Sequence, residues 1–216
     1  MSKSVHLIDH GMGNLFSIVR AFHHVGVEPI ITSDPECIVH ADRVVLPGVG
    51  AFAACMEAMK SNDMDQAVQQ FVKTGKPILG ICLGMQILFE HGTEFGLTEG
   101  LGLIQGQVNP LKPCILPDGR KAKIPNIGWL NVEVSSVAEH RSGLMEGITH
   151  PIAYYFVHSF MCCPSDPQNT VGTANYGANS ICAICRNDNV WGTQFHPERS
   201  GKDGLKIYRN FISLNL

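Results

Sequence analysis

The sequence predicts a single α/β domain in which a mostly parallel central sheet has helices on both faces and a mixed extension. In the first half, short apolar runs alternate with segments of helical periodicity, a pattern typical of parallel sheets. Beyond residue 103 the strand-like runs become shorter and are separated by Pro, Gly and Asn. The 216 residues are 44% apolar, enough to fill one large core. Because no linker, internal repeat or low-complexity tract divides the chain, residues 1–216 are expected to form one domain.

The first half opens with a strand followed by a helix. Residues 5–8 form an apolar run, and apolar side chains then recur at helical spacing at Leu15, Ile18, Val19, Phe22 and Val25. Further strands are expected at residues 28–32, 44–46 and 77–79, and helices at residues 52–60 and 64–73. In such a sheet the carboxyl ends of the parallel strands meet at one edge, where ligands bind.

The second half is expected to extend the sheet with strands of mixed direction. The strand candidates are residues 129–134, 153–157, 171–176, 180–186 and 190–195. A closing helix at residues 201–213 is expected to cover one face of the sheet through Leu205, Tyr208 and Ile212.

Composition limits the classes of function. The net charge is −3 and only 16% of residues are charged, which gives no electrostatic case for a nucleic-acid or membrane partner. No apolar stretch approaches the roughly 20 residues of a membrane span. Asp9 and His10 stand where a signal peptide needs its apolar core, so a cytoplasmic protein is expected.

Eight cysteines raise the alternatives of disulfides or a zinc site, mainly through Cys162-Cys163 and Cys182-Ala-Ile-Cys185. Alternation along the expected strand at residues 180–186 places Cys182 and Cys185 on opposite faces, which disfavours a shared metal. Most of these thiols are expected to be reduced core residues, and no metal or organic cofactor is expected.

One short segment carries the main chemical signal. Gly80-Ile81-Cys82-Leu83-Gly84-Met85-Gln86 follows a buried strand, and His196-Pro197-Glu198 lies near the end of the chain. A strand that ends at Cys82, with a helix restarting at Gly84, predicts a sharp elbow with the thiol at a helix N-terminus. A free thiol is only a few per cent thiolate at pH 7, so Cys82 needs His196 as its base and Glu198 to orient the imidazole.

A second segment supplies candidate oxyanion donors. The loops at residues 9–14 and 47–50 and the Cys82 elbow all follow strand ends, so they are expected to meet at one crevice. Glycines in Pro47-Gly48-Val49-Gly50 allow the Val49 N–H to turn toward a developing oxyanion, with the Leu83 N–H as the second donor. The alternative is an ordinary glycine-rich turn. Residues 11–14 are a weak phosphate-loop signal that lacks the full GxGxxG pattern and the Walker lysine.

Together the elbow, the Pro-Gly-Val-Gly segment and the His-Pro-Glu tripeptide resemble the class I (triad) glutamine amidotransferases over essentially the whole chain. Within the family, residues 9–14, 47–50 and 125–129 look most like the branch of imidazole glycerol phosphate synthase glutaminase subunits. The resemblance implies a class I glutamine amidotransferase fold for residues 1–216.

The resemblance also implies a chemistry. Cys82 would attack the side-chain amide of L-glutamine, His196 would protonate the departing ammonia, and water would hydrolyse the γ-glutamyl thioester. Further positions match family residues that hold the substrate amino acid: Gly50, Gln86, Glu94, His158, Ser159 and Phe160. Glu94 is suited to the substrate ammonium group.

A partner follows from the same resemblance. Members of this branch pass ammonia to a (β/α)₈ cyclase subunit in histidine biosynthesis, as a heterodimer. Asn14, Trp129 and Lys202 match positions expected at that interface. The family restrains glutamine hydrolysis until the acceptor is bound, and we expect the Val49 amide to point away from the oxyanion site in the resting state.

One segment departs from the branch. Its usual Pro-His-Met-Gly-Trp-Asn is replaced by Pro125-Asn126-Ile127-Gly128-Trp129-Leu130, and we expect this segment to face the partner. Three alternatives therefore stay open: ammonia supply to a sugar amidotransferase of surface polysaccharide synthesis, a stand-alone γ-glutamyl hydrolase, and a non-catalytic regulatory subunit. The intact triad argues against the last of these, and the glutaminase activity of the chain alone distinguishes them.

Overall fold

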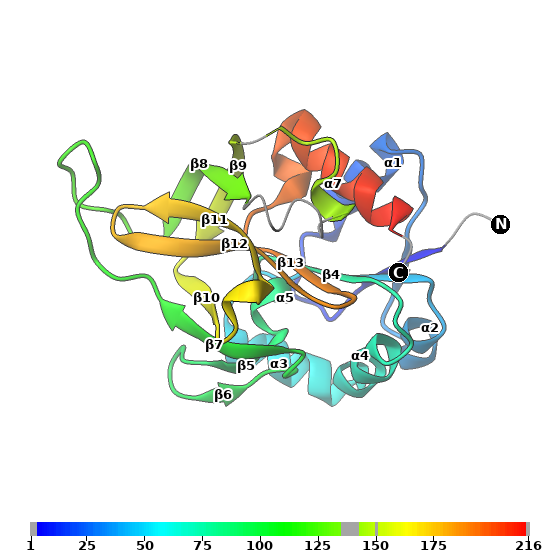
Figure 1. Ribbon diagram of the computed structural model, residues 1–216. Coiled ribbons are helices and arrows are strands. Elements are labelled where there is room, and N and C mark those ends of the chain that lie inside the picture. The colour runs from blue at the N-terminus through cyan, green and yellow to red at the C-terminus, as the bar shows by residue number, and fades with distance from the viewer. Residues whose placement is uncertain (1–3, 135–142, 150, 215–216) are drawn as a thin grey trace.

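The computed structural model describes residues 4–134, 143–149 and 151–214. A long twisted sheet runs through the middle of the molecule, with helices above and below it and a smaller sheet beside it (Figure 1). The described part of the central sheet has the strand order β2-β1-β3-β4-β13-β12-β11-β8-β9. The expected fold class is confirmed.

The first five strands in this order are parallel. They are β2 (Ile30–Thr32), β1 (Val5–Ile8), β3 (Arg43–Leu46), β4 (Ile78–Ile81) and β13 (Val190–Thr193). The last four run antiparallel to their neighbours, and they are β12 (Asn179–Asn187), β11 (Thr170–Tyr176), β8 (Asn126–Val134) and β9 (Ile152–His158). The sequence predicted all nine strands, and its boundaries differ from the observed ones by a few residues.

Helices cover both faces of the sheet, as expected. On one face lie α1 (Leu15–His24) and α7 (Gly201–Ser213), and on the other lie α2 (Pro35–Val39), α3 (Phe52–Ser61) and α4 (Met64–Val72) (Figure 1). Each face has its own apolar core, because alternate residues of one strand point to opposite sides. In β3, for example, Val45 packs with α1 and α7, whereas Val44 and Leu46 pack with α2, α3 and α4.

A buried arginine fixes the end of α7. Arg43, 1% exposed, donates from Nε to the Phe211 carbonyl and from Nη2 to the Leu214 carbonyl. These acceptors belong to the last turn of the helix, whose carbonyls have no partner within the helix. A cation at a helix C-terminus is also favoured by the helix dipole, which explains a charged residue in this otherwise apolar strand.

The smaller sheet was not predicted. It has the order β10-β7-β5-β6, with strands β5 (Phe89–Gly92), β6 (Thr98–Glu99), β7 (Ile104–Pro110) and β10 (Phe160–Pro164). Its strands carry weak signals, because β6 has only two residues and β7 is mostly polar, with Ile104 and Val108 as its only apolar side chains apart from a terminal proline. What orders them is pairing between distant segments, as in the β7–β10 pair.

The expectation about Cys182 and Cys185 was wrong. A register shift separates the pairs Thr170–Cys185 and Thr173–Cys182 on β11 and β12. The extra residue of such a bulge restores both cysteines to one face, where both pack in the core that contains α3 and α4. Among the described residues, no cluster of three or more His, Cys, Asp or Glu has metal-binding geometry.

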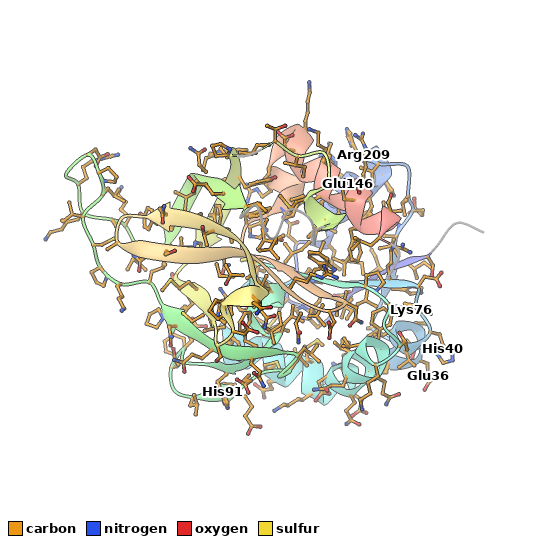
Figure 2. All side chains as sticks on the ribbon, in the orientation of Figure 1. Glu36, His40, Lys76, His91, Glu146 and Arg209 are labelled. Atoms are coloured by element: carbon orange, nitrogen blue, oxygen red, sulfur yellow. The ribbon has the colours of Figure 1, made fainter. Side chains whose placement is uncertain are left out.

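The charged side chains labelled in Figure 2 lie on the outside of the molecule. Of those labelled in Figure 2, Glu146 and Arg209 project on the α7 side, and Glu36 and His40 project on the α2 side. Within the described residues, no helix has both the length and the apolar character that a membrane span needs.

Candidate functional site

Cys82 stands at a strained turn between two elements. It follows β4 directly and precedes α5 (Leu83–Gln86), with φ 55° and ψ −111°. A positive φ is unfavourable for a residue with a Cβ, so the surrounding contacts must impose it. The Cys82 N–H donates to the Thr193 carbonyl of β13 at 2.8 Å, and its carbonyl accepts from the Gln86 N–H at 3.1 Å. Because α5 is a single turn, the helix dipole expected at the thiol is small.

Glycines allow the elbow to approach the neighbouring strand closely. A Cβ on Gly84 would overlap the Leu46 carbonyl oxygen, and one on Gly48 would lie 2.7 Å from the Gly84 backbone nitrogen. The end of β3 and the start of α5 therefore touch backbone to backbone. This contact places the Pro47-Gly48-Val49-Gly50 segment beside the thiol.

His196 and Glu198 form a buried pair. His196 Nδ1 lies 2.7 Å from Glu198 Oε1, and the two side chains are 7% and 0% exposed. Glu198 is held on η3 (Pro197–Arg199), a short helical turn that directly follows His196. The pairing fixes the imidazole with Nδ1 protonated, which leaves Nε2 as the reactive nitrogen.

The electrostatics of His196 favour a proton on the ring. Burial lowers its pKa, but the adjacent Cys82 sulfur and the Glu198 carboxylate together raise it to about 10. His196 Nε2 is buried and has no hydrogen-bond partner among the described residues. The Cys82 thiol points to the Val157 carbonyl at 3.7 Å. The resting sulfur thus lies near Nε2 without a well-formed hydrogen bond to it.

A cavity of about 270 Å³ opens beside the thiol. Ten of the residues singled out in the sequence line it: Val49, Gly50, Cys82, Leu83, Gln86, Glu94, His158, Ser159, Phe160 and His196. Glu198 is excluded from this cavity, because it lies behind the imidazole. Pro125 also lines the cavity, whereas the sequence analysis expected it only in the segment that faces the partner.

The two backbone N–H groups expected to bind the oxyanion differ in whether they already have a hydrogen-bond acceptor. Leu83 is the first residue of α5, where a helix offers no internal acceptor for the N–H. The Val49 N–H instead donates to the Met12 carbonyl at 2.9 Å, so it is already occupied. His10 Nε2 lies 2.8 Å from the Pro47 carbonyl oxygen and ties the same segment to the first loop. In this state only one of the two donors is available to an oxyanion.

Gln86 ties the elbow to the opposite wall of the cavity. Its Nε2 donates to the Phe160 carbonyl at 3.1 Å and to Gln194 Oε1 at 3.0 Å. Gln194 Nε2 in turn lies 3.8 Å from Cys82 Sγ. Sequence reasoning missed Gln194. The sequence signal that could have found it is a polar amide residue in a mostly apolar segment, two residues before His196. The structure shows that this amide side chain is fully buried.

Glu94 supplies a carboxylate at the cavity. Its Oε2 accepts a hydrogen bond of 2.8 Å from the Phe52 N–H, at the first residue of α3. Helix N-termini stabilise anions, so this contact holds the Glu94 carboxylate in place. A fixed anion here is suited to a ligand ammonium group.

His158 is locked in one neutral form. Its Nε2 accepts from Asn126 Nδ2 at 3.1 Å, and its Nδ1 donates to the Phe160 carbonyl at 2.8 Å. Burial, helped by the nearby charge of His196, lowers the pKa of His158 to about 4 in spite of the bond to Phe160. His158 therefore shapes the backbone of the cavity wall and does not carry charge.

The prediction that residues 125–130 face a partner was wrong at two positions, Asn126 and Leu130, where the branch has His and Asn. Asn126 is 2% exposed and Leu130 packs against the core, so both point inward. The outward face of β8 carries Ile127 and Trp129, which are 61% and 55% exposed. The Asn126 substitution thus acts on His158 and leaves the outward face unchanged.

The three positions expected at a partner interface are exposed. Asn14 accepts a hydrogen bond from the Ser17 N–H, so it also caps α1. Trp129 contacts the Tyr155 ring at 6.0 Å, and Arg199 lies over the same ring at 4.6 Å. Lys202 is in the first turn of α7, directly after η3. Helix α1 also packs against η3, so these groups surround the turn that carries Glu198.

Comparison with known proteins gives a consistent result. The family described as glutamine amidotransferase class-I matches residues 6–214. Two relatives, each 42% identical, are the imidazole glycerol phosphate synthase subunits HisH 1 of Legionella pneumophila (strain Lens) and HisH of Methanosarcina barkeri (strain Fusaro / DSM 804). The alignments cover 98% of this chain, and 100% and 99% of those relatives.

Solved structures agree on the fold. The structure of PurLQS from Thermotoga maritima is 19% identical with a TM-score of 0.74, and the alignment covers 99% of both chains. A crystal structure of a glutamine amidotransferase is 17% identical with a TM-score of 0.71, and the alignment covers 97% of both chains. With the match to residues 6–214, these results show that the chain belongs to the class I glutamine amidotransferase family.

Proposed function

We propose that this chain is the glutaminase subunit of an imidazole glycerol phosphate synthase, which releases ammonia from L-glutamine for a cyclase subunit in histidine biosynthesis. The observation that carries the proposal is the cavity, because Cys82, His196 and Glu94 all line it. A glutamine bound there has its ammonium at a carboxylate and its side-chain amide at the thiol. The names of the relatives at 42% identity support the pathway.

Catalysis begins with proton transfer between Cys82 and His196. The thiolate attacks the amide carbon of glutamine, and the Leu83 N–H stabilises the oxyanion. His196 Nε2 then gives its proton to the departing nitrogen, so ammonia leaves and a γ-glutamyl thioester remains. Water, deprotonated by His196, cleaves the thioester to glutamate and regenerates the thiol. Glu198 holds Nδ1 throughout and stabilises the imidazolium.

The occupied Val49 amide supports a restrained resting state. With its N–H bonded to the Met12 carbonyl, the site lacks one of its two oxyanion donors. One such donor contributes about 10² to 10³ in rate. Rotation of the Gly48–Val49 peptide on partner and acceptor binding would supply it, so hydrolysis would depend on the acceptor.

The partner is a cyclase subunit with a (β/α)₈ barrel, bound as a heterodimer. Support comes from the exposed groups around η3, where Trp129 presents a large aromatic surface suited to an interface anchor. Asn14 and Lys202 flank the same turn. Docking there would bring the partner close to Glu198 and so to the triad.

The test is glutamate release by the chain mixed with a histidine-pathway cyclase subunit. We expect slow release by the chain alone and strong stimulation when the cyclase carries its phosphoribulosyl formimino aminoimidazole carboxamide nucleotide. The matched control is the Cys82→Ala chain, which should release no glutamate under any condition.

Other outcomes identify the alternatives. Absence of stimulation, with Cys82 still labelled by an electrophilic glutamine analogue, would reject the histidine-pathway partner and favour another acceptor enzyme. Full activity of the chain alone on γ-glutamyl peptides would indicate a hydrolase. Absence of both labelling and hydrolysis would indicate a non-catalytic subunit.

A further inference from the structure

A tyrosine of the last helix contacts the triad carboxylate. The Tyr208 hydroxyl donates to Glu198 Oε2 at 3.3 Å, whereas Glu198 Oε1 is bonded to His196. The two oxygens of one carboxylate are thus held from opposite sides. The sequence indicated Tyr208 only as an apolar contact of α7 with the sheet.

The contact lies in a fully buried setting. Tyr208 is 0% exposed and packs edge-on against the Phe22 ring of α1, with centroids 4.7 Å apart. Burial, and then the neighbouring Glu198 charge, raise the pKa of Tyr208 well above its ordinary value. The hydroxyl therefore stays protonated at every physiological pH and acts as a donor to the carboxylate.

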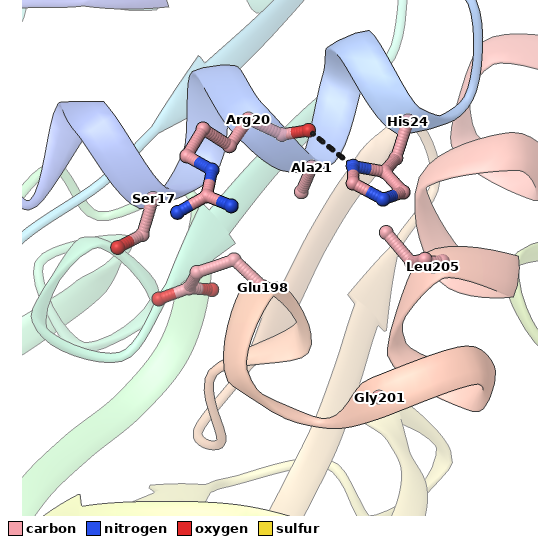
Figure 3. Close-up of a pocket in the computed structure, with 7 residues that line it drawn as sticks. All are labelled: Ser17, Arg20, Ala21, His24, Glu198, Gly201 and Leu205. Atoms are coloured by element: carbon pink, nitrogen blue, oxygen red, sulfur yellow. Dashed lines mark hydrogen bonds between the residues drawn. The ribbon is translucent and has the colours of Figure 1, made fainter.

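Other charged groups near Glu198 do not hold it. The Glu198 carboxylate borders a second cavity on the side away from Cys82, and the Arg20 guanidinium points into the same cavity (Figure 3). His24 of α1 lines its far end. No ion pair joins Arg20 or His24 to Glu198 among the described residues, and the Glu198 side chain is closed off from solvent.

A carboxylate with one donor can still turn about its last side-chain bond. Such a rotation swings Oε1 away from His196 Nδ1 and lets the imidazole tilt. Two donors on different oxygens fix the plane of the group. The Tyr208 bond, at 3.3 Å, is the longer of the two, so its effect is on orientation more than on stability. In a catalytic triad, loss of imidazole alignment costs rate without changing substrate contacts.

We propose that Tyr208 is a positioning residue of the triad, whose hydroxyl fixes the Glu198 carboxylate plane and thereby keeps His196 Nε2 aimed at Cys82. This inference rests on the proposed glutaminase function. Tyr208 does not touch the cavity at Cys82, so it acts only through Glu198.

The test compares Tyr208→Phe with a matched control, Tyr154→Phe. Tyr154 is also 0% exposed and packs on the Phe195 ring at 4.1 Å, but its hydroxyl has no hydrogen-bond partner among the described residues. Each change removes one buried hydroxyl and keeps the ring. Both variants and the wild-type chain are measured as complexes with the cyclase subunit and its nucleotide ligand.

We expect Tyr208→Phe to lower kcat about threefold to tenfold with KM unchanged, and Tyr154→Phe to leave both unchanged. The basic limb of the pH–rate profile of Tyr208→Phe should move to lower pH, because a looser contact with Glu198 gives less support to the raised pKa of His196. Labelling of Cys82 by the glutamine analogue should slow by a similar factor. Thermal melting of both variants checks that they remain folded.

Equal kcat and equal pH profiles for Tyr208→Phe and wild type would overturn the positioning role. A uniform loss in both variants, accompanied by a lower melting temperature, would also overturn it, because that pattern indicates a general packing effect. An inactive wild-type complex would instead reject the glutaminase proposal itself, so the two failures have different signatures.

Discussion

The parallel and antiparallel halves of the central sheet serve different purposes. Strands β1, β3, β4 and β13 are buried along their whole length, because helices cover both faces. In β8 and β9 buried and exposed residues alternate, since one face meets solvent. The parallel half ends in Cys82 and leads from β13 to His196, whereas the antiparallel half supplies His158 and the exposed Trp129. Full burial suits the reactive groups, and a half-exposed sheet provides both a cavity wall and an outer surface.

Removal of the Cys82 nucleophile, which the parallel half carries, should give the largest loss of glutamine hydrolysis. Cys82→Ala is expected to reduce glutamine hydrolysis by about 10⁴-fold or more, because no other group forms the thioester. Synthesis from added ammonium salts by the complex should persist. Cys37→Ala is the matched control, since Cys37 is an exposed thiol. Loss of the ammonium-dependent reaction as well would mean that Cys82 is structural.

The two partners of the nucleophile should differ in importance. His196→Ala is expected to reduce kcat by about 10⁴-fold or more. The loss in kcat for Glu198→Gln is expected to be about 10²-fold smaller, because Glu198 only orients and stabilises the imidazole. Steady-state glutamate release by the complex measures both. Equal losses would reject this ranking of the two residues.

The antiparallel half should show its contribution in the pH dependence of stability. Because the folded pKa of His158 is about 4 and the unfolded value is about 6.5, the unfolded chain binds more protons between these pH values. The stabilisation is complete above pH 6.5 and is lost as the pH falls toward 4, by about 3 kcal/mol. Denaturant unfolding should show a smaller slope for His158→Gln than for wild type. Part of the slope remains in the variant, because burial also lowers the pKa of His6.

The exposed His24 provides the control for that measurement, because its ring contacts only the Arg20 carbonyl. His24→Gln should keep the wild-type slope between pH 6.5 and 4. If His158→Gln also keeps that slope, then His158 is not the group that titrates.

Substitutions on the outer surface of the antiparallel half should have the smallest effect. They should change association with the cyclase subunit and leave the chemical steps unchanged. Trp129→Ala is expected to raise the Kd for the cyclase subunit about tenfold, because it removes an aromatic anchor. Titration calorimetry measures the affinity directly. Ile31→Ala, at the opposite edge of the sheet and 49% exposed, should not change it. An unchanged Kd for Trp129→Ala would move the interface away from β8.

Predictability from sequence differed between the central sheet, whose nine strands were all predicted, and the smaller sheet, which was missed. The fully buried strands have continuous apolar runs, so the elements that carry Cys82 and precede His196 were located from sequence with small boundary errors. The smaller sheet was missed because β5, β6 and β7 are short or polar and are ordered by distant pairing. The bulge that brings Cys182 and Cys185 to one face also left no local signal.

By itself the sequence determined the fold class and the elbow at Cys82, and it predicted a triad of Cys82, His196 and Glu198, because these depend on local patterns of apolar, glycine and reactive residues. Only the tertiary structure decided how the amides and side chains are used. It directs the Val49 N–H to the Met12 carbonyl, turns Asn126 inward to His158 and places Tyr208 against Glu198. The first two contacts join residues far apart in the chain, and the third joins helix α7 to the turn η3 before it. In each case the hydrogen-bond partner is set by how the elements pack.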